Sequence, residues 1–275
     1  MTEPLHLARA VARELIGLPM VSAVALAGSR GSAGAGADAS SDFDLYAYTS
    51  ADIPREAVEA IISRLGGAAR QDPRFGYWGP GDEWIATDGT AIDVVHFGTG
   101  WMEEQLDRVV VRHEPSLGYT TCFWHTIRSS MPLEDPSGWF ASLQARAAVP
   151  YPEELRSRIV RYNRPVLRGI IPSYATQLGK AAKRGDLVSV NHRLAGFLAG
   201  YFDILFAVNR ATHPGEKRLL EHAAGLEHLP EGFAGDVTDL LETATVDLAG
   251  LAGRIDRLVD RLDALLLAED LDPTP

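Results

Sequence analysis

The sequence predicts an α+β fold: an α/β-type N-terminal domain with a small mixed sheet, followed by an all-α helical bundle. Over the first 150 residues, short apolar runs typical of buried strands alternate with patterns of helical spacing. From about residue 152 onward, the apolar residues recur at helical spacing. A length of 275 residues suits two domains of ordinary size. We therefore expect one domain at residues 1–150 and a second at residues 151–275.

The N-terminal elements follow from apolar spacing and from turn residues. In chain order they are a helix at 5–15, strands at 21–27 and 43–48, a helix opened by Pro54, a loop at 76–81, and a hairpin of strands 83–87 and 90–97. The first helix is expected to end at Gly17 and Pro19. The hairpin is expected because Asp88-Gly89 supplies the positive φ angles that a tight turn needs.

The C-terminal half carries three helix signals. Gly185-Asp186 predicts the end of one helix and the N-cap of the next. That next helix begins at Leu187 and is expected to break at His213-Pro214-Gly215. A last helix is expected over roughly 236–267. Its apolar residues alternate in spacing between 4 and 3, which is typical of a bundle seam; they are Leu251, Ile255, Leu258, Leu262 and Leu265.

Composition excludes several classes of protein. Hydrophobic residues make up 46% of the chain and charged residues 23%, the balance of a globular protein. No apolar run approaches the roughly 18 residues that span a bilayer, and the start lacks the layout of a signal peptide, so we expect a cytoplasmic protein without membrane spans. Cys122 is the only cysteine, which excludes an internal disulfide and a cysteine-based zinc cluster. A net charge of −11 disfavours binding to long nucleic acid.

The charges are unevenly distributed along the chain. Residues 153–184 hold eight basic residues against Glu153 and Glu154, whereas acids outnumber bases from Glu221 to the end. One interpretation is two differently solvated faces. The other is a basic surface for phosphates beside an acidic surface that attracts a cationic partner.

Three aspartates carry the strongest chemical signal. Asp42 and Asp44 lie at the start of an expected strand, where residues two apart point to the same face. Two close carboxylates repel each other unless a cation lies between them, and oxygen ligands favour magnesium. Asp93 lies within a later apolar strand, where an acidic residue is against local propensity. Such an exception to the pattern is where a functional residue is expected.

A glycine-rich loop precedes the first two aspartates. Gly28 lets a phosphate approach the backbone, Ser29 adds a hydroxyl donor, and the amides of 30–32 could form an anion-binding nest. Arg30 is either a phosphate contact or a solvated side chain. The loop is not a P-loop, because no Gly-Lys-Ser/Thr closes it. It is not a dinucleotide-binding turn either, because the glycines leave no room for a long helix.

The sequence resembles the nucleotidyltransferase superfamily with the polymerase-beta-type palm. Three motifs carry the resemblance, in this order: Gly28-Ser29, Asp42-x-Asp44, and an aspartate on a later strand, Asp93. Within this superfamily, the chain looks most like the bacterial small-molecule nucleotidyltransferases of the aminoglycoside and lincosamide type, which also have a helical C-terminal domain. The segments 118–125 and 209–220 are similar to an uncharacterised bacterial subgroup of this superfamily.

The resemblance implies transfer of a nucleoside monophosphate, AMP from ATP, to a hydroxyl of a small-molecule acceptor such as an aminoglycoside-like antibiotic, with release of pyrophosphate. Asp42 and Asp44 would hold Mg²⁺. Asp93 would be a third metal ligand or the base that takes the acceptor proton. Gly28 and Ser29 would hold the β- and γ-phosphates of the nucleotide.

The resemblance also implies roles for the two domains: residues 1–150 as the nucleotidyltransferase domain and residues 151–275 as a helical substrate-binding domain. Lys217 is either a phosphate ligand from the helical domain or a solvated helix start. Glu83, on the strand paired with that of Asp93, either faces the acceptor or has an exposed structural role. Two alternative functions stay open: adenylylation of a protein side chain, and a non-catalytic nucleotide-binding regulatory or antitoxin-like module.

Overall fold

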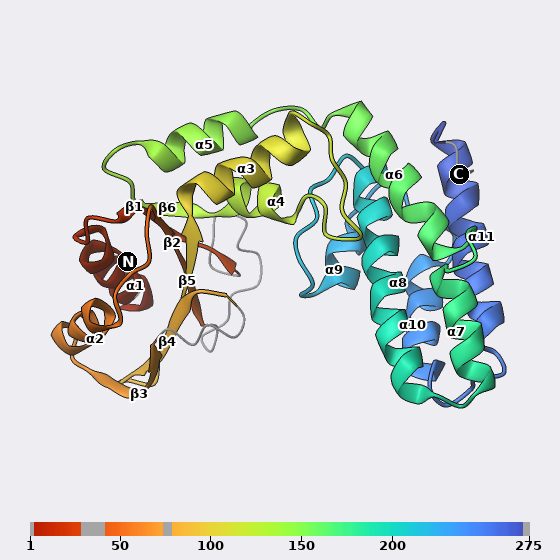
Figure 1. The fold of residues 1–275 in the computed structure, drawn as a ribbon, viewed down its shortest axis with the longest axis horizontal. Helices are drawn as coiled ribbons and strands as arrows, with labels where there is room; N and C mark the ends of the chain where they lie inside the picture. Colours follow the sequence, from red (N-terminus) through yellow and green to blue (C-terminus); the bar gives the residue numbers. More distant parts are fainter. Residues whose placement is uncertain (1–2, 29–41, 74–78, 272–275) are drawn as a thin grey trace. The chain divides into compact units, whose positions relative to one another are not determined.

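The structure, a computed structural model, describes residues 3–28, 42–73 and 79–271. The chain divides into two compact units, one of residues 1–107 and 126–149, the other of residues 108–125 and 150–275. The predicted α+β fold class is confirmed, because a mixed sheet with helices forms the first unit and helices dominate the second (Figure 1). Residues 108–125, which precede the boundary expected from the sequence, belong to the second unit.

The first half of the chain holds the strands and five of the described helices, of which α3 and α4 cross the division between the units. In chain order these elements are α1 (Glu3–Ile16), β1 (Val21–Leu26), β2 (Phe43–Thr49), α2 (Arg55–Arg64), β3 (Ala68–Pro73), β4 (Gly81–Ala86), β5 (Ala91–Gly98), α3 (Thr99–Val110), α4 (Cys122–Ser129), β6 (Met131–Glu134) and α5 (Trp139–Ala147).

The described strands form one six-stranded sheet in the order β3-β4-β5-β2-β1-β6. β2 and β5 are parallel, and the other neighbouring pairs are antiparallel. A parallel pair needs a crossover connection, which α2, β3 and β4 supply between β2 and β5. Gly81, expected in a loop, instead begins β4. The expected hairpin is confirmed, with its turn at Asp88-Gly89 between β4 and β5.

One face of the sheet packs against α1 and α2 (Figure 1). Alternate strand residues such as Phe43, Leu45 and Ile92 are buried there because every second side chain of a strand points to the same face. The helices contribute Ala8, Val11, Ala12, Leu15, Val58, Ile61 and Ile62 to this core. The strand residues that alternate with these buried ones, including Asp44 and Asp93, therefore lie on the opposite face of the sheet.

That opposite face is covered by α5 at one end. The ring of Tyr48 stacks on Phe140 of α5 with centroids 4.8 Å apart, and both side chains are fully buried. Tyr46, two residues earlier on the same strand and face, is only half-buried.

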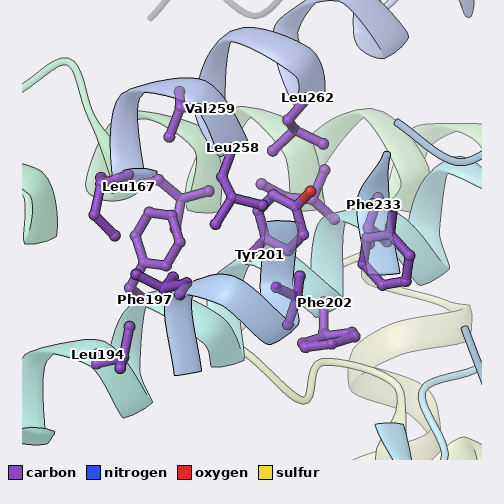
Figure 2. Close-up of a cluster of buried hydrophobic side chains, with 14 of the residues drawn as sticks. Leu167, Leu194, Phe197, Tyr201, Phe202, Phe233, Leu258, Val259 and Leu262 are labelled. Carbon is purple, nitrogen blue, oxygen red and sulfur yellow. The ribbon is translucent and has the colours of Figure 1, made fainter. Parts of the chain in front are cut away.

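The second unit contains helices α6 (Glu153–Leu167), α7 (Tyr174–Lys183), α8 (Leu187–Val208), α9 (Leu219–Ala224), α10 (Phe233–Thr243) and α11 (Leu251–Ala268). Asp186 caps α8 by accepting a hydrogen bond from the backbone N–H of Ser189, as the sequence predicted. Every residue from 200 to 208 of α8 is buried, which is typical of a core helix. Figure 2 shows Tyr201 of α8 between Phe197 and Phe233, whose ring centroids lie 6.0 and 6.3 Å from its own. None of the described helices is both long and apolar enough to span a membrane.

The single helix expected over 236–267 is wrong, because the chain folds back between α10 and α11. Gly250 precedes α11, and a Cβ atom there would overlap the carboxylate of Asp247 and come 2.7 Å from the guanidinium of Arg254. The reversal lets Val237 and Leu240 of α10 join the same buried cluster as the seam of α11. Apolar spacing alone indicated a helix on both sides of this turn, but did not indicate the turn.

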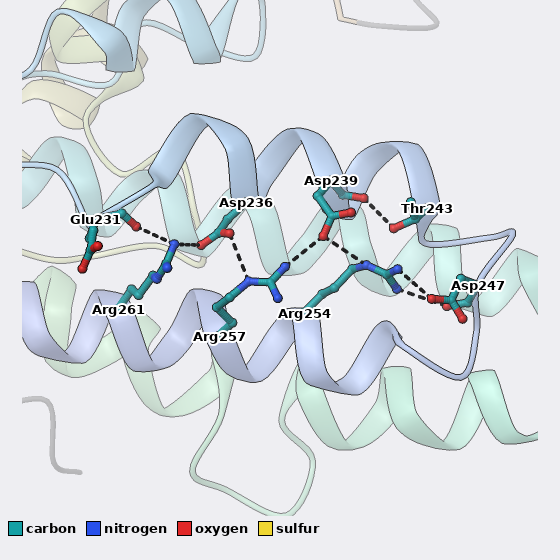
Figure 3. Close-up of polar contacts among 8 residues, drawn as sticks. All are labelled: Glu231, Asp236, Asp239, Thr243, Asp247, Arg254, Arg257 and Arg261. Carbon is teal, nitrogen blue, oxygen red and sulfur yellow. Dashed lines mark hydrogen bonds and ion pairs between the residues drawn. The ribbon is translucent and has the colours of Figure 1, made fainter.

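Three arginines of α11 tie it to α10 (Figure 3). Arg254 and Arg257 both bond the carboxylate of Asp239, at 3.2 and 2.8 Å. Arg257 also donates to Asp236, which accepts a second hydrogen bond from Arg261 at 2.6 Å. Because each carboxylate is shared, these contacts form a network rather than isolated surface pairs.

The basic stretch of α6 is neutralised within the second unit. Arg156 donates to Glu269 at 2.9 Å. Arg164 forms a two-pronged pair with Asp263, and Arg168 pairs with Asp256 and Asp260 of α11. These three arginines connect α6 to α11 and its C-terminal end, so they do not form an open basic surface for phosphates.

Candidate active site

Parallel pairing of β2 with β5 makes Asp44 and Asp93 direct neighbours. The two residues are register partners, and both are half-buried on the sheet face opposite α1 and α2. Glu83, exposed on β4, is in turn the register partner of Asp93. Adjacent strands lie about 4.8 Å apart. Asp44 and Asp93 are therefore placed for their carboxylates to share one cation.

Asp42 comes directly before β2 and is exposed. Among the residues that the structure describes, no group of three or more His, Cys, Asp or Glu side chains is arranged to hold a metal ion. Magnesium commonly binds through one or two carboxylates together with substrate phosphates. The pair of Asp44 and Asp93 offers this oxygen-only donor chemistry.

Gly28 lies directly against Asp44. The backbone N–H of Ala27 donates to the carbonyl oxygen of Asp44 at 2.8 Å, which holds the end of β1 beside the start of β2. Gly28 has a φ of +60°, and a Cβ atom at this position would overlap Oδ2 of Asp44. A glycine is therefore required both by the left-handed backbone and by the neighbouring carboxylate.

Replacing Gly28 with alanine is expected to lower the free energy of unfolding more than the same change at Gly138. Gly138 belongs to the same unit and has a similar φ of +70°, but a Cβ atom there meets nothing within 4 Å. Both variants bear the left-handed backbone cost of roughly 1–2 kcal/mol, whereas only Gly28→Ala displaces Asp44. Urea unfolding of both variants measures the difference. Equal losses would contradict the close contact between Gly28 and Asp44.

Three further residues were predicted from the sequence to contact phosphates. Ser29 and Arg30 lie outside the described residues. Lys217 belongs to the second unit and is exposed in the turn before α9. Trp84 and Trp124 are buried.

The comparisons with known proteins concern the fold. No protein-family model matches the chain, and no curated protein matches it. Among solved structures, the chain is similar to a nucleotidyltransferase-like protein. That protein comes from Exiguobacterium sibiricum; the TM-score is 0.42, the sequence identity is 14%, and the match covers 96% of this chain and 74% of that chain.

Aromatic residues that the sequence reasoning missed lie on the same sheet face as the carboxylates. Tyr46 follows Asp44 by two residues, and Phe97 follows Asp93 by four. Their rings meet edge to face at 5.1 Å. Their even spacing from the aspartates was the available signal, because residues i, i+2 and i+4 of a strand share a face.

The second unit has a buried carboxyl group of its own. Asp203 of α8 accepts hydrogen bonds from the backbone N–H of Thr120 at 2.9 Å, from the Thr120 hydroxyl at 2.6 Å, and from the amide of Asn163 at 3.3 Å. Burial raises the pKa of Asp203 to about 7, although these hydrogen bonds and the guanidinium of Arg108 oppose the shift. Asp203 thus ties the segment 108–125 to α8.

The two segments singled out by the resemblance, 118–125 and 209–220, meet in the second unit. The backbone N–H of His213 donates to the hydroxyl of Thr121 at 2.8 Å, and the ring of His213 lies 4.8 Å from that of Tyr119. His125 and Thr212 are joined by a hydrogen bond of 2.9 Å. Burial lowers the pKa of His213 to about 4, with the nearby His125 and His222 acting in the same direction. The segments form a packed junction.

Proposed function

We propose that the chain is a magnesium-dependent nucleotidyltransferase that moves a nucleoside monophosphate, AMP from ATP, to a hydroxyl of a small-molecule acceptor. The observation that carries the proposal is the register pairing of Asp44 with Asp93 on the sheet face opposite α1 and α2. The close approach of Gly28 to Asp44 supports it, because a residue without a side chain leaves room for phosphate oxygens beside the carboxylates.

In this proposal Asp42 and Asp44 hold Mg²⁺, and Asp93 is either a third ligand or the base that takes the acceptor proton. The ion supplies charge neutralisation for the phosphates and for the leaving pyrophosphate. The carboxylates fix the position of the α-phosphorus relative to the acceptor, since nucleotidyl transfer depends mainly on in-line positioning and electrostatics. The backbone around Gly28 lies beside the β- and γ-phosphates, and Ser29, Arg30 and Lys217 are further candidate phosphate ligands.

The reaction needs one proton transfer. The acceptor hydroxyl oxygen forms a bond to the α-phosphorus, while the bond between that phosphorus and the bridging oxygen breaks and pyrophosphate leaves with the electron pair. The hydroxyl proton passes to a carboxylate. Asp93 is the candidate base because it lies on a central strand beside Asp44.

Calorimetric titration of ATP, GTP, CTP and UTP, with and without Mg²⁺, tests the proposal. The wild type is expected to bind at least one triphosphate with Mg²⁺ and at least tenfold more weakly after EDTA removes it, since the phosphates are bound through the ion. Asp44→Asn is expected to weaken binding by a similar factor. The control is Glu56→Gln. Glu56 is an exposed acid on α2, which packs against the sheet face that does not carry the aspartates, so the change removes the same charge and the variant is expected to bind like the wild type.

The other outcomes separate the alternatives. Binding together with pyrophosphate release onto a hydroxylated small molecule supports the proposed reaction. Radioactive AMP transferred from ATP to protein of a cell extract would favour adenylylation of a protein side chain. Binding without any transfer would favour a regulatory nucleotide-binding module, and no binding of any triphosphate by the wild type would contradict the nucleotide site.

A further inference from the structure

Three aromatic side chains form a continuous surface beside the carboxylates. We call Tyr46, Phe97 and Trp101 the aromatic shelf. Tyr46 meets Phe97 edge to face at 5.1 Å, and Phe97 stacks on Trp101 at 5.8 Å with the two ring planes only 5° apart. Trp101 lies in the first turn of α3, directly after β5, so β2, β5 and α3 each contribute one ring.

The shelf is graded from buried to exposed. Tyr48, two residues after Tyr46 on the same strand, is fully buried and stacks on Phe140. Its ring centroid lies 6.2 Å from that of Phe97. Tyr46 and Phe97 are half-buried, and Trp101 is 44% exposed. A large aromatic held rigidly by parallel stacking, yet almost half exposed, keeps a preformed ring surface in contact with solvent. Such a surface loses little conformational entropy when it binds a second ring.

The shelf begins close to the carboxylates and extends away from them along the strands. Tyr46 follows Asp44 by two residues on the same face, or about 7 Å along the strand, and Phe97 follows Asp93 by four residues, or about 13 Å. Gly28 lies against Asp44 at the start of β2, before Tyr46. A triphosphate held at Gly28 and Asp44 that extends along β2 therefore brings its nucleoside to the shelf.

We propose that the aromatic shelf binds the base of the nucleoside triphosphate by stacking, with Trp101, which is 44% exposed, as its main contact. This inference rests on the proposed function, because the phosphates must first be held at the carboxylates. Stacking tolerates any base, since every base has a flat π face. The shelf thus supplies affinity for a nucleoside without selecting its identity through hydrogen bonds.

Titration of Mg·ATP and of Mg·tripolyphosphate, which lacks a nucleoside, tests the shelf. The wild type is expected to bind Mg·ATP about tenfold more tightly than Mg·tripolyphosphate, the gain typical of one stacked base. Trp101→Ala is expected to remove most of this difference and to leave tripolyphosphate binding unchanged, whereas Trp101→Phe keeps a ring and retains most of it. Tyr162→Ala removes an exposed aromatic ring of α6 in the second unit and serves as the matched control.

The outcomes distinguish the shelf from the phosphate site. If both ligands bind equally well and Trp101→Ala changes neither affinity, stacking on the shelf is refuted while the phosphate site stands. Equal weakening of both ligands by Trp101→Ala also refutes stacking, because the preference for Mg·ATP over Mg·tripolyphosphate is then kept without the ring. If the wild type binds neither ligand, both the shelf proposal and the proposed function fall.

Discussion

Replacing Asp203 with alanine is expected to lower the free energy of unfolding of the second unit by about 3 kcal/mol or more. The substitution removes the carboxylate acceptor of the backbone N–H of Thr120 and of the Thr120 hydroxyl, which bond it at 2.9 and 2.6 Å. Each buried polar group that loses its partner costs about 1–3 kcal/mol. Urea unfolding followed by circular dichroism measures the loss, and a loss below 1 kcal/mol would contradict the role of Asp203 as an internal anchor.

The same residue gives the wild type a defined pH dependence. Burial raises the pKa of Asp203 from 3.8 to about 7, so between these values the folded state holds a proton that the unfolded state has released. This proton on Asp203 stabilises the folded state. The stabilisation is fully present below about pH 4 and is lost as the pH rises through about 7. At roughly 1.4 kcal/mol per pKa unit, the decline amounts to a few kcal/mol.

Asp203→Asn is expected to remove this decline, because asparagine stays neutral at both pH values. The free energy of unfolding is compared at pH 4.5 and pH 7.5 for the wild type, for Asp203→Asn and for Glu242→Gln, an exposed acid on α10. The decline measured for Glu242→Gln shows how much removing one ordinary surface carboxyl changes the pH dependence. A decline of equal size in Asp203→Asn and in the wild type would show that another group is responsible.

Asp93→Asn is expected to lower the rate of nucleotidyl transfer by at least about 100-fold, the usual contribution of a positioned carboxylate base. The variant also separates the two roles open to Asp93. If Asp93 takes the acceptor proton, Mg·ATP affinity stays close to that of the wild type while turnover falls. If Asp93 is a metal ligand, the Mg²⁺ concentration needed for half-maximal binding rises as well.

Glu83→Gln is the matched control for Asp93→Asn. Glu83 is exposed on β4 in register with Asp93, so the change removes an equal charge one strand further from Asp44. Its effect on the rate of pyrophosphate release is expected to stay within about threefold, as for a surface charge in high dielectric. A loss comparable to that of Asp93→Asn would place Glu83 in the reaction instead.

Local sequence rules apply to residues within one strand. The i, i+2 rule predicted that Asp42 and Asp44 share a face, although β2 begins at Phe43, and propensity identified Asp93 as an acid that a strand does not favour. The pairing of β2 with β5 lay beyond these rules, because the two strands are parallel and two other strands lie between them in the chain. Register is fixed by tertiary packing, which no short window of sequence contains.

The same reasoning explains what was missed in the helical half. Asp203 interrupts an apolar run between Phe202 and Ile204, the kind of exception that drew notice to Asp93, so the signal was present. Its partner Thr120 lies 83 residues away in the chain, and this contact could not be predicted. The turn at Gly250 was missed because helical spacing continues on both sides of it.

The two units are built from alternating segments of the chain, and this has a consequence for folding during synthesis. The chain passes between the units at residues 107/108, 125/126 and 149/150, so neither unit is a continuous piece of the gene. During translation, residues 108–125 emerge long before the α8 residues that bond them, including Asp203. The first unit can close once β6 and α5 have left the ribosome, whereas the 108–125 segment must wait for α8. A single cut of the gene therefore cannot release either unit whole.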